Sequence, residues 1–577
     1  MIKAPWLAFY DSVPYHLDYP DVSMLSMVEE TAENYPDYVA YDFMGSKATY
    51  TQFVNEIHQC AKALRALGIK EEDRITVCLP NVPQAIIMFY AINMIGAISN
   101  MIHPLSSEGE IEFYLNDSHS VAAITLDAFY EKFEAIRKNT TVKYLLITSI
   151  KDKLSTIKTF GFNLTKGRKI KPLPKNANVI LWKDFLAGGE NYRLEYRALR
   201  KGGDPAVILY SGGTTGTTKG ILLTNLNFNA LAMQTTAMGD CLKPGNAMLS
   251  IMPVFHGFGL GIGIHTMLIN GCKCILIPSF SAQTFGLLLK KNQPNFIAGV
   301  PTLYEALLKS EKIKGVNLSC LKGVFSGGDS LSIELKKKVD RFLKEHGATV
   351  QIREGYGTTE CVTASCLTPK NYAREGSIGI PFPDTYYKIV KTNTQEEVPY
   401  GTEGEICICG PTVMLGYVGN PKETAHTLQF HPDGHTWLHT GDLGYMDEDG
   451  FVYYRQRLKR MIISSGYSIY PSQLENIIDA HEAVLMSTVI GVDDPYKIQK
   501  VKAFIVLKPK VSPTDQVKES IREHCSKNIA KYAMPYEFEY RESLPKTLVG
   551  KVAYTILEVE EKEKEKMRNQ RHDQYLE

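Results

Sequence analysis

One run of the chain combines the residue types that bind a polyphosphate. It follows the apolar residues 206–209 and consists of Tyr210-Ser211-Gly212-Gly213-Thr214-Thr215-Gly216-Thr217-Thr218-Lys219-Gly220. Glycine lets the main chain approach a phosphate closely, threonine hydroxyls donate hydrogen bonds, and the lysine ammonium supplies a point charge. A strand that ends in such a loop predicts a nucleotide-binding site.

The run differs from the Walker loop, in which Gly-Lys-Ser/Thr opens a helix. Here Thr218 precedes Lys219, and Gly220 follows it. The alternative interpretation is a flexible surface loop. Most loops rich in glycine and threonine, however, lack such a lysine and a preceding strand of the buried type.

Four further segments carry groups that suit a nucleotide. They are Gly355-Tyr356-Gly357-Thr358-Thr359-Glu360, Thr440-Gly441-Asp442, Arg457 and Gly550-Lys551. An aromatic ring can stack on a purine, a carboxylate beside phosphates can hold Mg²⁺, and a carboxylate at a tight turn can accept hydrogen bonds from two ribose hydroxyls. Taken singly, each segment has an ordinary alternative: a turn, a turn-forming aspartate or a surface charge.

Together, the five segments resemble the adenylate-forming enzyme superfamily. This superfamily includes acyl-CoA synthetases, aryl-CoA ligases, firefly-type luciferases and the adenylation domains of peptide synthetases. The resemblance extends from Ala48-Thr49-Tyr50 to Lys551, with all five segments in the family's order. In texture the whole chain is most similar to bacterial-type fatty acyl-CoA ligases.

The resemblance implies a role for each matching residue. It implies a nucleotide-binding set of Ser211, Gly212, Gly213, Thr214, Thr215, Gly216, Lys219, Gly328, Gly355, Tyr356, Gly357, Thr359, Asp442, Arg457, Ser465 and Gly466. Glu360 and Thr215 would hold Mg²⁺, and the catalytic group would be Lys551, Thr215, Glu360 and His256. The acyl pocket would include His256, Phe258, Val300 and Gly327, and Lys459 would be the hinge between two domains.

Two positions depart from the family pattern. Gly212 stands where the family usually has serine, and Thr218 stands where it usually has proline. The lost serine removes one phosphate donor, but the neighbouring threonines and the main chain can compensate. We therefore expect an active enzyme.

The chemistry that the resemblance implies has two steps. A carboxylate does not condense with a thiol in neutral water, because its oxygen is a poor leaving group. Attack on the α-phosphorus of ATP gives an acyl-AMP whose leaving group is AMP, and coenzyme A then takes the acyl group. The expected cofactors are ATP and Mg²⁺, with coenzyme A as co-substrate.

Residues 253–264 and the expected pocket wall contain no fixed charge that could recognise a second carboxylate or an amino group. We therefore expect a medium- or long-chain fatty acid. Three alternatives remain: an aryl- or bile-acid–CoA ligase, an acyl-AMP ligase that loads a carrier protein, and a non-catalytic nucleotide-binding regulator.

Apolar strand-like runs alternate with helical patterns through much of the chain. This pattern predicts an α/β fold of layered subdomains, with a small antiparallel barrel or sheet from about residue 402 and a small C-terminal α/β domain behind a hinge. We expect a large domain at 1–457, a small mobile domain at 458–558 and a charged tail at 559–577, solvated or disordered. Residues 85–102 predict a buried helix that leads into a strand.

The composition excludes some partners. With 64 basic and 63 acidic residues, the chain has no overall charge that would attract nucleic acid or an anionic membrane. Eleven cysteines without a Cys-x-x-Cys pair, and an N-terminus that does not look like a leader, favour the cytoplasm. We expect a small carboxylic acid as the partner and no integral membrane segment; peripheral membrane contact and the oligomeric state stay open.

Overall fold

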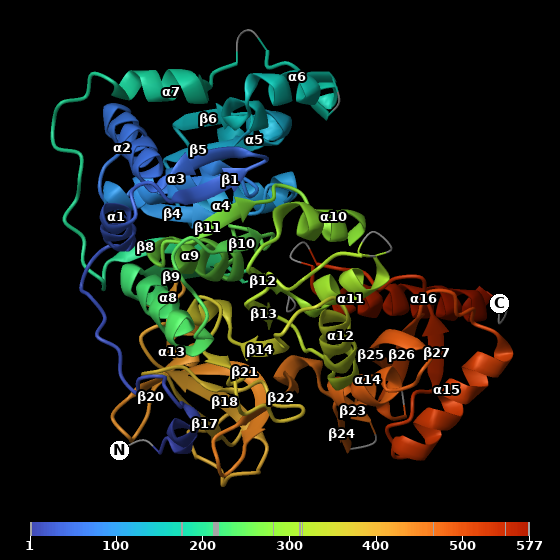
Figure 1. Cartoon of the computed structure of the whole chain (residues 1–577). Coiled ribbons are helices and arrows are strands. Elements are labelled where there is room, and N and C mark those ends of the chain that lie inside the picture. Colours follow the sequence, from blue (N-terminus) through green and yellow to red (C-terminus); the bar gives the residue numbers. More distant parts are fainter. Residues whose placement is uncertain are drawn as a thin grey trace.

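The computed structural model describes residues 3–574, except residues 165, 175–176, 212–217, 281, 311–312, 314, 465–466, 495 and 548–549. Within these residues, two large mixed sheets and a small antiparallel sheet build the N-terminal region, and a further sheet lies in the C-terminal region (Figure 1). The predicted layered α/β class is confirmed.

The first large sheet has the strand order β19-β9-β8-β4-β3-β5-β6-β7. In that order its strands span Gly416–Tyr417, Gly220–Thr224, Pro205–Tyr210, Ile98–Met101, Arg74–Cys78, Ala122–Leu126, Tyr144–Thr148 and Ile180–Leu181. Because successive side chains of a strand alternate between faces, Ile75 and Val77 enter one core while Cys78 enters another. The first core includes side chains of α2 (Tyr50–Ala66), α3 (Pro83–Met94) and α7 (Trp182–Gly189), and the second those of α4 (Glu108–Asp117) and α5 (Tyr130–Ile136).

The second large sheet has the order β16-β15-β14-β13-β12-β10-β11-β1-β2. Its strands span Ile380–Pro381, Cys366–Leu367, Ile352–Tyr356, Gly323–Ser326, Phe296–Gly299, Ala247–Ser250, Lys273–Leu276, Val39–Phe43 and Ser46–Thr49. One face packs on α10 (Ala282–Asn292), α11 (Pro301–Lys309) and α12 (Ile333–Glu345), and the other joins the core that the two large sheets share.

Helix α3 lies in this shared core, and all of its residues are buried. A helix that is apolar on every side is expected only in such a position. Strand β4 follows it, so the predicted helix running into a strand is confirmed. No helix in the described part of the chain combines the length and apolar character needed to cross a bilayer. The other helices of this region are α1 (Met24–Asn34), α6 (Thr156–Leu164), α8 (Asn225–Gly239), α9 (Met267–Ile269) and α13 (Pro421–Thr427).

The small antiparallel sheet has the order β17-β18-β21-β20, and β22 pairs with β21. The strands β17, β18, β21, β20 and β22 span Tyr386–Val390, Gly404–Cys409, Thr436–Met446, Leu428–Phe430 and Val452–Arg457. The N-terminus of the chain lies beside this sheet (Figure 1), where Trp6 packs edge-on against Tyr386. The predicted change to short antiparallel strands is therefore present.

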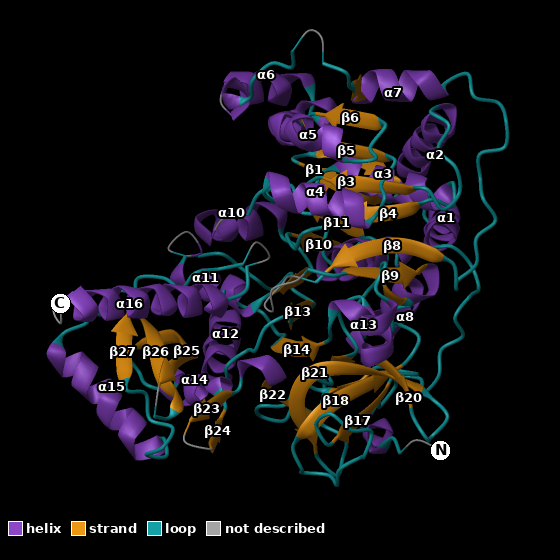
Figure 2. Cartoon of the chain, turned by 180° about the vertical axis from the view of Figure 1, so that it is seen from behind, coloured by secondary structure: helices purple, strands orange, loops and turns teal. Residues whose placement is uncertain are grey.

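The C-terminal sheet has the order β24-β23-β26-β25, and β27 pairs with β26. The strands β24, β23, β26, β25 and β27 span Tyr467–Ile469, Ile462–Ser464, Ile498–Leu507, Val484–Asp494 and Glu537–Tyr540. Helices α14 (Pro471–Asp479) and α15 (Asp515–Asn528) cover it. Helix α14 also packs on α12 of the large region. Figure 2 shows this arrangement from behind.

Helix α16 (Tyr554–Gln574) runs across the predicted boundary at residue 558. The ammonium of the buried Lys502 lies 2.9 Å from Glu561, 2.8 Å from Glu539 and 3.1 Å from Glu537. Burial alone would lower the pKa of Lys502, but hydrogen bonds to these carboxylates raise it. Leu557 is also buried, in an apolar cluster with Leu544. The first turns of α16 therefore belong to the packed domain, whereas the sequence predicted a solvated segment.

Candidate active site

The carboxyl ends of parallel strands lie together at one edge of the second large sheet. In register, Gly299 of β12 pairs with Ser326 of β13, and Ser326 pairs with Glu354 of β14. The residues that follow these positions are Val300, Gly327 and Gly355. All three are among the site residues predicted from the sequence. Ligands of open α/β sheets bind at such an edge, so the topology itself predicts a site here.

Tyr356 and Asp442 meet although they lie on different sheets. The Tyr356 hydroxyl donates to Asp442 Oδ2 at 2.5 Å, and Arg457 Nε lies 3.0 Å from Asp442 Oδ1. Strands β21 and β22 place Asp442 opposite Arg457 in register. Burial raises the pKa of the Asp442 carboxyl and the Arg457 charge opposes this, whereas Asp442 raises the pKa of Arg457. Three of the predicted nucleotide-binding residues thus form one hydrogen-bonded group.

A buried chain of side chains holds the turn before Asp442. Glu405 Oε1 accepts from the Gly441 N–H at 2.9 Å, and Glu405 Oε2 lies 3.0 Å from His439 Nδ1. His439 Nε2 is 2.9 Å from His431 Nε2. A carboxylate only accepts, so His439 Nδ1 carries the proton, and one of the two facing Nε2 atoms donates to the other. Burial and the nearby Lys388 lower the pKa of His431 to about 4, so this imidazole is neutral at neutral pH.

Glu360 belongs to a second group, which lies where the phosphate loop meets β19, the edge strand of the first large sheet. The Tyr417 hydroxyl donates to Glu360 Oε1 at 2.9 Å. Lys219 Nζ lies 4.9 Å from the centre of the Tyr417 ring and is paired with Glu423. The structure therefore brings Lys219 and Glu360 to the same tyrosine. A phosphate would compete with Glu423 for the lysine.

Lys551 enters the site from the C-terminal region. Its side chain packs over Gly328. A Cβ added at this glycine would lie 3.4 Å from Lys551 Cε. Burial lowers the pKa of Lys551, while Asp329, Asp442 and Glu360 oppose this shift. Of these three carboxylates, Asp329 has the largest effect on the pKa of Lys551. Burial raises the pKa of the Asp329 carboxyl itself. Two contacts fix the loop: the Thr302 hydroxyl donates to the Gly550 carbonyl at 2.5 Å, and the Val552 N–H donates to Asp329 at 3.4 Å.

His256 lies close to Lys551 at the start of a π-helical segment, Phe258–Thr266. Its Nδ1 accepts from the Phe258 N–H at 3.1 Å. Burial, together with the Lys551 charge, lowers the pKa of His256 to about 3, so the ring is neutral. A neutral histidine can serve as a polar wall beside a reacting carboxylate.

The turn after His256 interlocks with the one after Glu360. A Cβ on Gly257 would lie 1.8 Å from the Val362 carbonyl oxygen, so only glycine fits there. Val362 has φ +65° and ψ −59°, and the Thr363 N–H donates to the Cys361 carbonyl at 2.8 Å. This is a classic γ-turn, which is rare and strained for a β-branched residue. The close contact therefore holds the backbone after His256 against the turn that follows Glu360.

An apolar pocket begins beside the lysine. Its lining residues are Thr235, Gly239, Cys241, Leu242, Met248, Phe258, Ile262, Met267, Phe296, Phe325, Ser326, Gly327, Gly328, Gly355, Thr363, Ala364, Cys366, Leu367 and Phe382. Of the predicted acyl-pocket residues, Phe258 and Gly327 are among them. Val300 instead packs against Gly328 and Gly550 at the lysine loop. No charged side chain lines the pocket.

Several predicted residues lie outside the described residues: Gly212, Gly213, Thr214, Thr215, Gly216, Ser465 and Gly466. Ser211 is described, and its N–H donates to the Lys219 carbonyl across the ends of the loop. Lys459 lies in the short helical turn Leu458–Arg460. Gly357 and Thr359 flank the buried Thr358 between Tyr356 and Glu360. The roles of all these residues stay predictions.

Mg²⁺ fits the residues near the phosphate loop. The described part of the chain holds no cluster of three or more side chains that could enclose a metal ion. Mg²⁺ commonly takes one or two carboxylates and completes its shell with phosphates and water. Glu360 offers such a carboxylate, so a metal carried by the nucleotide suits this site better than a resident one.

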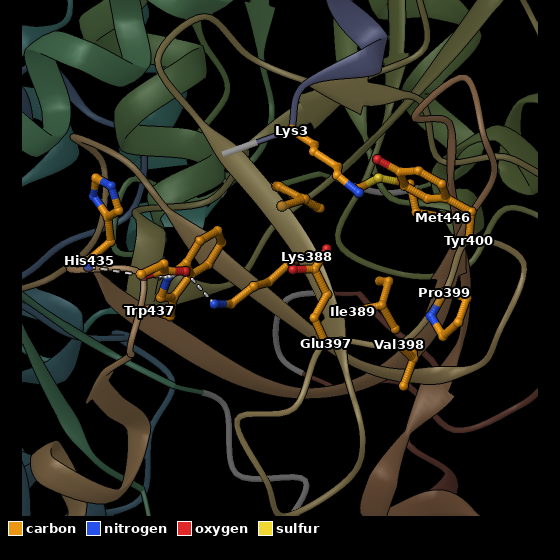
Figure 3. A pocket seen from close by; sticks show the side chains of 12 residues that line it. Lys3, Lys388, Ile389, Glu397, Val398, Pro399, Tyr400, His435, Trp437 and Met446 are labelled. Atoms are coloured by element: carbon orange, nitrogen blue, oxygen red, sulfur yellow. Dashed lines mark hydrogen bonds and ion pairs between the residues drawn. The ribbon is translucent and has the colours of Figure 1, made fainter. Parts of the chain in front are cut away.

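A second pocket lies on the small sheet (Figure 3). It is lined by Lys3, Tyr387, Lys388, Ile389, Glu397, Val398, Pro399, Tyr400, Asp433, His435, Trp437 and Met446. Lys388 Nζ lies 2.6 Å from Asp433 and 4.1 Å from the centre of the Trp437 ring, and Trp437 Nε1 donates to Asp433 at 3.0 Å. These polar groups satisfy one another, which indicates a structural role.

Four contributors to the site were not predicted from the sequence: Asp329, Glu405, Tyr417 and Glu423. Asp329 directly follows Gly327-Gly328, and its position after two glycines at a strand end was a usable signal. The other three act through partners far away in the chain, and nothing local distinguishes them from surface residues.

The comparisons with known proteins agree with this geometry. Residues 28–418 match the family model "AMP-binding enzyme", and residues 473–551 match "AMP-binding enzyme C-terminal domain". The fold and site define a nucleotide-binding α/β protein with an added lysine-bearing domain. The chain belongs to the AMP-binding enzyme family, and the predicted resemblance is confirmed.

Among its relatives are long-chain-fatty-acid–CoA ligases of two bacteria. The one from Bacillus subtilis (strain 168) is 36% identical over 97% of this chain and 99% of its own length. The one from Salmonella typhimurium is 32% identical over 96% and 97%. The solved structure of the anthranilate CoA ligase AuaEII in complex with anthranoyl-AMP has a TM-score of 0.80 at 24% identity, covering 96% of this chain and 99% of that one.

Proposed function

We propose that this enzyme activates a medium- or long-chain fatty acid with ATP and transfers the acyl group to coenzyme A, releasing AMP and pyrophosphate. The relatives named long-chain-fatty-acid–CoA ligases support the reaction and the substrate class. The observation that carries the proposal is the convergence of Lys551, the Tyr356–Asp442 pair and an uncharged pocket on one strand edge.

Adenylation uses the groups at this edge. The substrate carboxylate attacks the α-phosphorus of ATP, the bond to pyrophosphate breaks, and an acyl-AMP forms. Negative charge then concentrates at the α-phosphate, where the Lys551 ammonium is placed to stabilise it. A preorganised donor of this kind contributes about 3 kcal/mol in comparable sites. Mg²⁺ near Glu360 would neutralise charge on the phosphates.

The nucleotide would bind across the hydrogen-bonded group of Tyr356, Asp442 and Arg457. Two ribose hydroxyls would donate to Asp442 and replace the Tyr356 hydroxyl, which then frees the tyrosine ring to stack on adenine. Arg457 would keep Asp442 ionised, since the two charges lie 3.0 Å apart. The Glu405 chain would keep the Gly441 turn in place during this exchange.

Thioester formation needs Lys551 to leave the acyl carbon. We place the hinge at Lys459, between two anchored arginines. Arg457 is paired with Asp442 of the large region, and Arg460 is paired with Glu475 of α14 in the C-terminal region. Only Leu458 and Lys459 separate the two anchors, so rotation would concentrate there.

The free state of the cysteines suits the expected compartment. All eleven are unpaired, and most are buried. Disulfides are rare where thiols are kept reduced, so we expect the enzyme to work in the cytoplasm. ATP, Mg²⁺ and coenzyme A would all be available there.

Release of pyrophosphate and AMP tests the proposal. The purified enzyme is given Mg-ATP with a panel of fatty, aromatic and steroid acids, with and without free coenzyme A. We expect acid-dependent ATP–pyrophosphate exchange with fatty acids and acyl-CoA when coenzyme A is present. Exchange without thioester formation would favour a carrier-loading ligase, and no exchange with any acid would contradict the proposal.

A further inference from the structure

One short stretch of chain contributes three residues to the lining of the pocket beside Lys551. They are Gly239, the last residue of α8, and Cys241 and Leu242, which follow it. Cys241 and Leu242 are only partly buried, and the neighbouring Asp240 and Lys243 are exposed. This stretch therefore contacts both the pocket and solvent, and we call it the wall of the pocket.

Arg353 of β14 holds this wall through hydrogen bonds. It lies on β14 opposite the pocket residue Phe325 of β13 in register, so the two side chains belong to the same face of the sheet. Its guanidinium donates to the carbonyls of Met238 at 2.7 Å, Gly239 at 2.9 Å and Thr368 at 2.8 Å. It also lies 5.9 Å from the centre of the Phe325 ring.

These three carbonyls are an unusual set of partners for a buried charge. No ion pair of Arg353 occurs among the described residues, and burial lowers its pKa to about 10. The last carbonyls of a helix carry partial negative charge and lack partners within the helix, so a cation is favourable there. Asp240 has φ +48°, which turns the chain sharply away from α8 at the same point. Arg353 thus fixes both the end of α8 and the direction of the wall.

We propose that Arg353 is a specificity-determining residue that sets the length of the acyl pocket. The inference rests on the proposed function and concerns the same site. While the guanidinium holds the end of α8, the wall at Cys241 stays closed and limits the chain that fits. When it is lost, the wall can move outward, and a longer acyl chain can extend toward solvent.

Two opposite variants test this length limit. Arg353→Met keeps the volume of the stem but loses all three hydrogen bonds, whereas Cys241→Trp adds bulk to the wall. We measure kcat/KM for saturated acids of increasing length and take the ratio of long to short. Single methylenes in apolar pockets change kcat/KM by about tenfold or more, so we expect the ratio to rise by at least about tenfold in the first variant and to fall similarly in the second.

Two further variants control for general damage. Arg353→Lys keeps a charge but can reach fewer carbonyls, so it should give an intermediate ratio. Lys370→Ala removes only the exposed pair with Asp240, 3.1 Å apart, and should leave the ratio unchanged. If Arg353→Met does not fold, as judged by its Tm, the ratio of the Arg353→Lys variant decides whether Arg353 sets the length, and an unchanged ratio in a folded Arg353→Lys variant overturns the proposal.

The inference is overturned if Cys241→Trp lowers kcat/KM equally for all acids or not at all, or if a folded Arg353→Met variant does so. Failure of the proposed function is a different result: in that case the unmodified enzyme releases no pyrophosphate with any acid of the series.

Discussion

The nucleotide side and the lysine side of the site are built differently. Tyr356, Asp442 and Arg457 lie on strands within the large region, and Asp442 is further supported by the buried chain from Glu405 to His431. Lys551 comes from the C-terminal region, and the contacts of its loop with the large region include one hydrogen bond from Thr302 and one to Asp329.

This difference indicates a division of work. The side that we propose for the nucleotide is held before ligand arrives, because its groups are fixed by strand pairing and buried hydrogen bonds. The lysine side can detach at a small cost, since a typical hydrogen bond contributes only about 1 kcal/mol. A site that must run two reactions in turn benefits from one fixed and one removable half.

The largest effect should follow from removing the lysine. Lys551→Ala should lower the rate of adenylation by about 10² to 10³ while ATP affinity changes little, because the ammonium acts on charge that develops during reaction. Single-turnover acyl-AMP formation and ATP binding measure the two quantities. Lys546→Ala, on the same loop, is the matched control and should behave like the unmodified enzyme. Normal acyl-AMP formation in the Lys551 variant would contradict the assigned role.

The hinge is tested by fixing it. Lys459→Pro restricts the backbone between the two anchored arginines, so adenylation should continue while thioester formation is largely lost. Acyl-AMP and acyl-CoA are quantified in the same reaction. An equal loss of both products would show that the substitution damages the site rather than the movement.

The supporting chain on the nucleotide side should matter less than the lysine. Glu405→Gln replaces a carboxylate that serves both the Gly441 N–H and His439, so one of these donors is left poorly matched. We expect ATP affinity to fall by about tenfold, in keeping with about 1–3 kcal/mol for a disturbed buried hydrogen bond. Since the lysine is untouched, kcat at saturating ATP should stay close to normal; a change in kcat alone would argue against a positioning role.

The smallest effect concerns pH and stability near the lysine side. Glu354 Oε1 accepts from the Leu331 N–H, next to the Asp329 segment, and burial raises the pKa of Glu354 from 4.5 to about 8. The folded state therefore binds more protons than the unfolded state between these values, and stability falls as pH rises through this window. Glu354→Gln should flatten this part of the Tm–pH curve. A wild-type Tm that rises from pH 5 to pH 8 with the same slope as the variant would contradict the assignment.

The sequence predicted the parts of the site that are local. Glycine-rich loops after strands, such as those around Gly328 and Tyr356, indicate a ligand-binding edge of the sheet, because parallel strands end together. The resemblance also implied that Asp442 and Arg457 both belong to the nucleotide-binding set, and the structure places them opposite each other on paired strands.

Other features depend on contacts that no local pattern contains. Glu405 acts through a turn on another strand, Tyr417 joins Lys219 to Glu360, and Arg353 caps a helix from a distant strand. The acidic and basic tail is a similar case. Its composition suggested solvent exposure, yet Glu561 pairs with the buried Lys502 of β26.

The loop that carries Lys551 is anchored on both sides by apolar packing. Leu544 before it and Leu557 after it lie in one apolar cluster of the C-terminal region, and α16 begins just beyond the lysine. The residues on both sides of the lysine are therefore fixed to the C-terminal region. We therefore expect the Lys551 ammonium to leave the site only when the whole C-terminal region rotates.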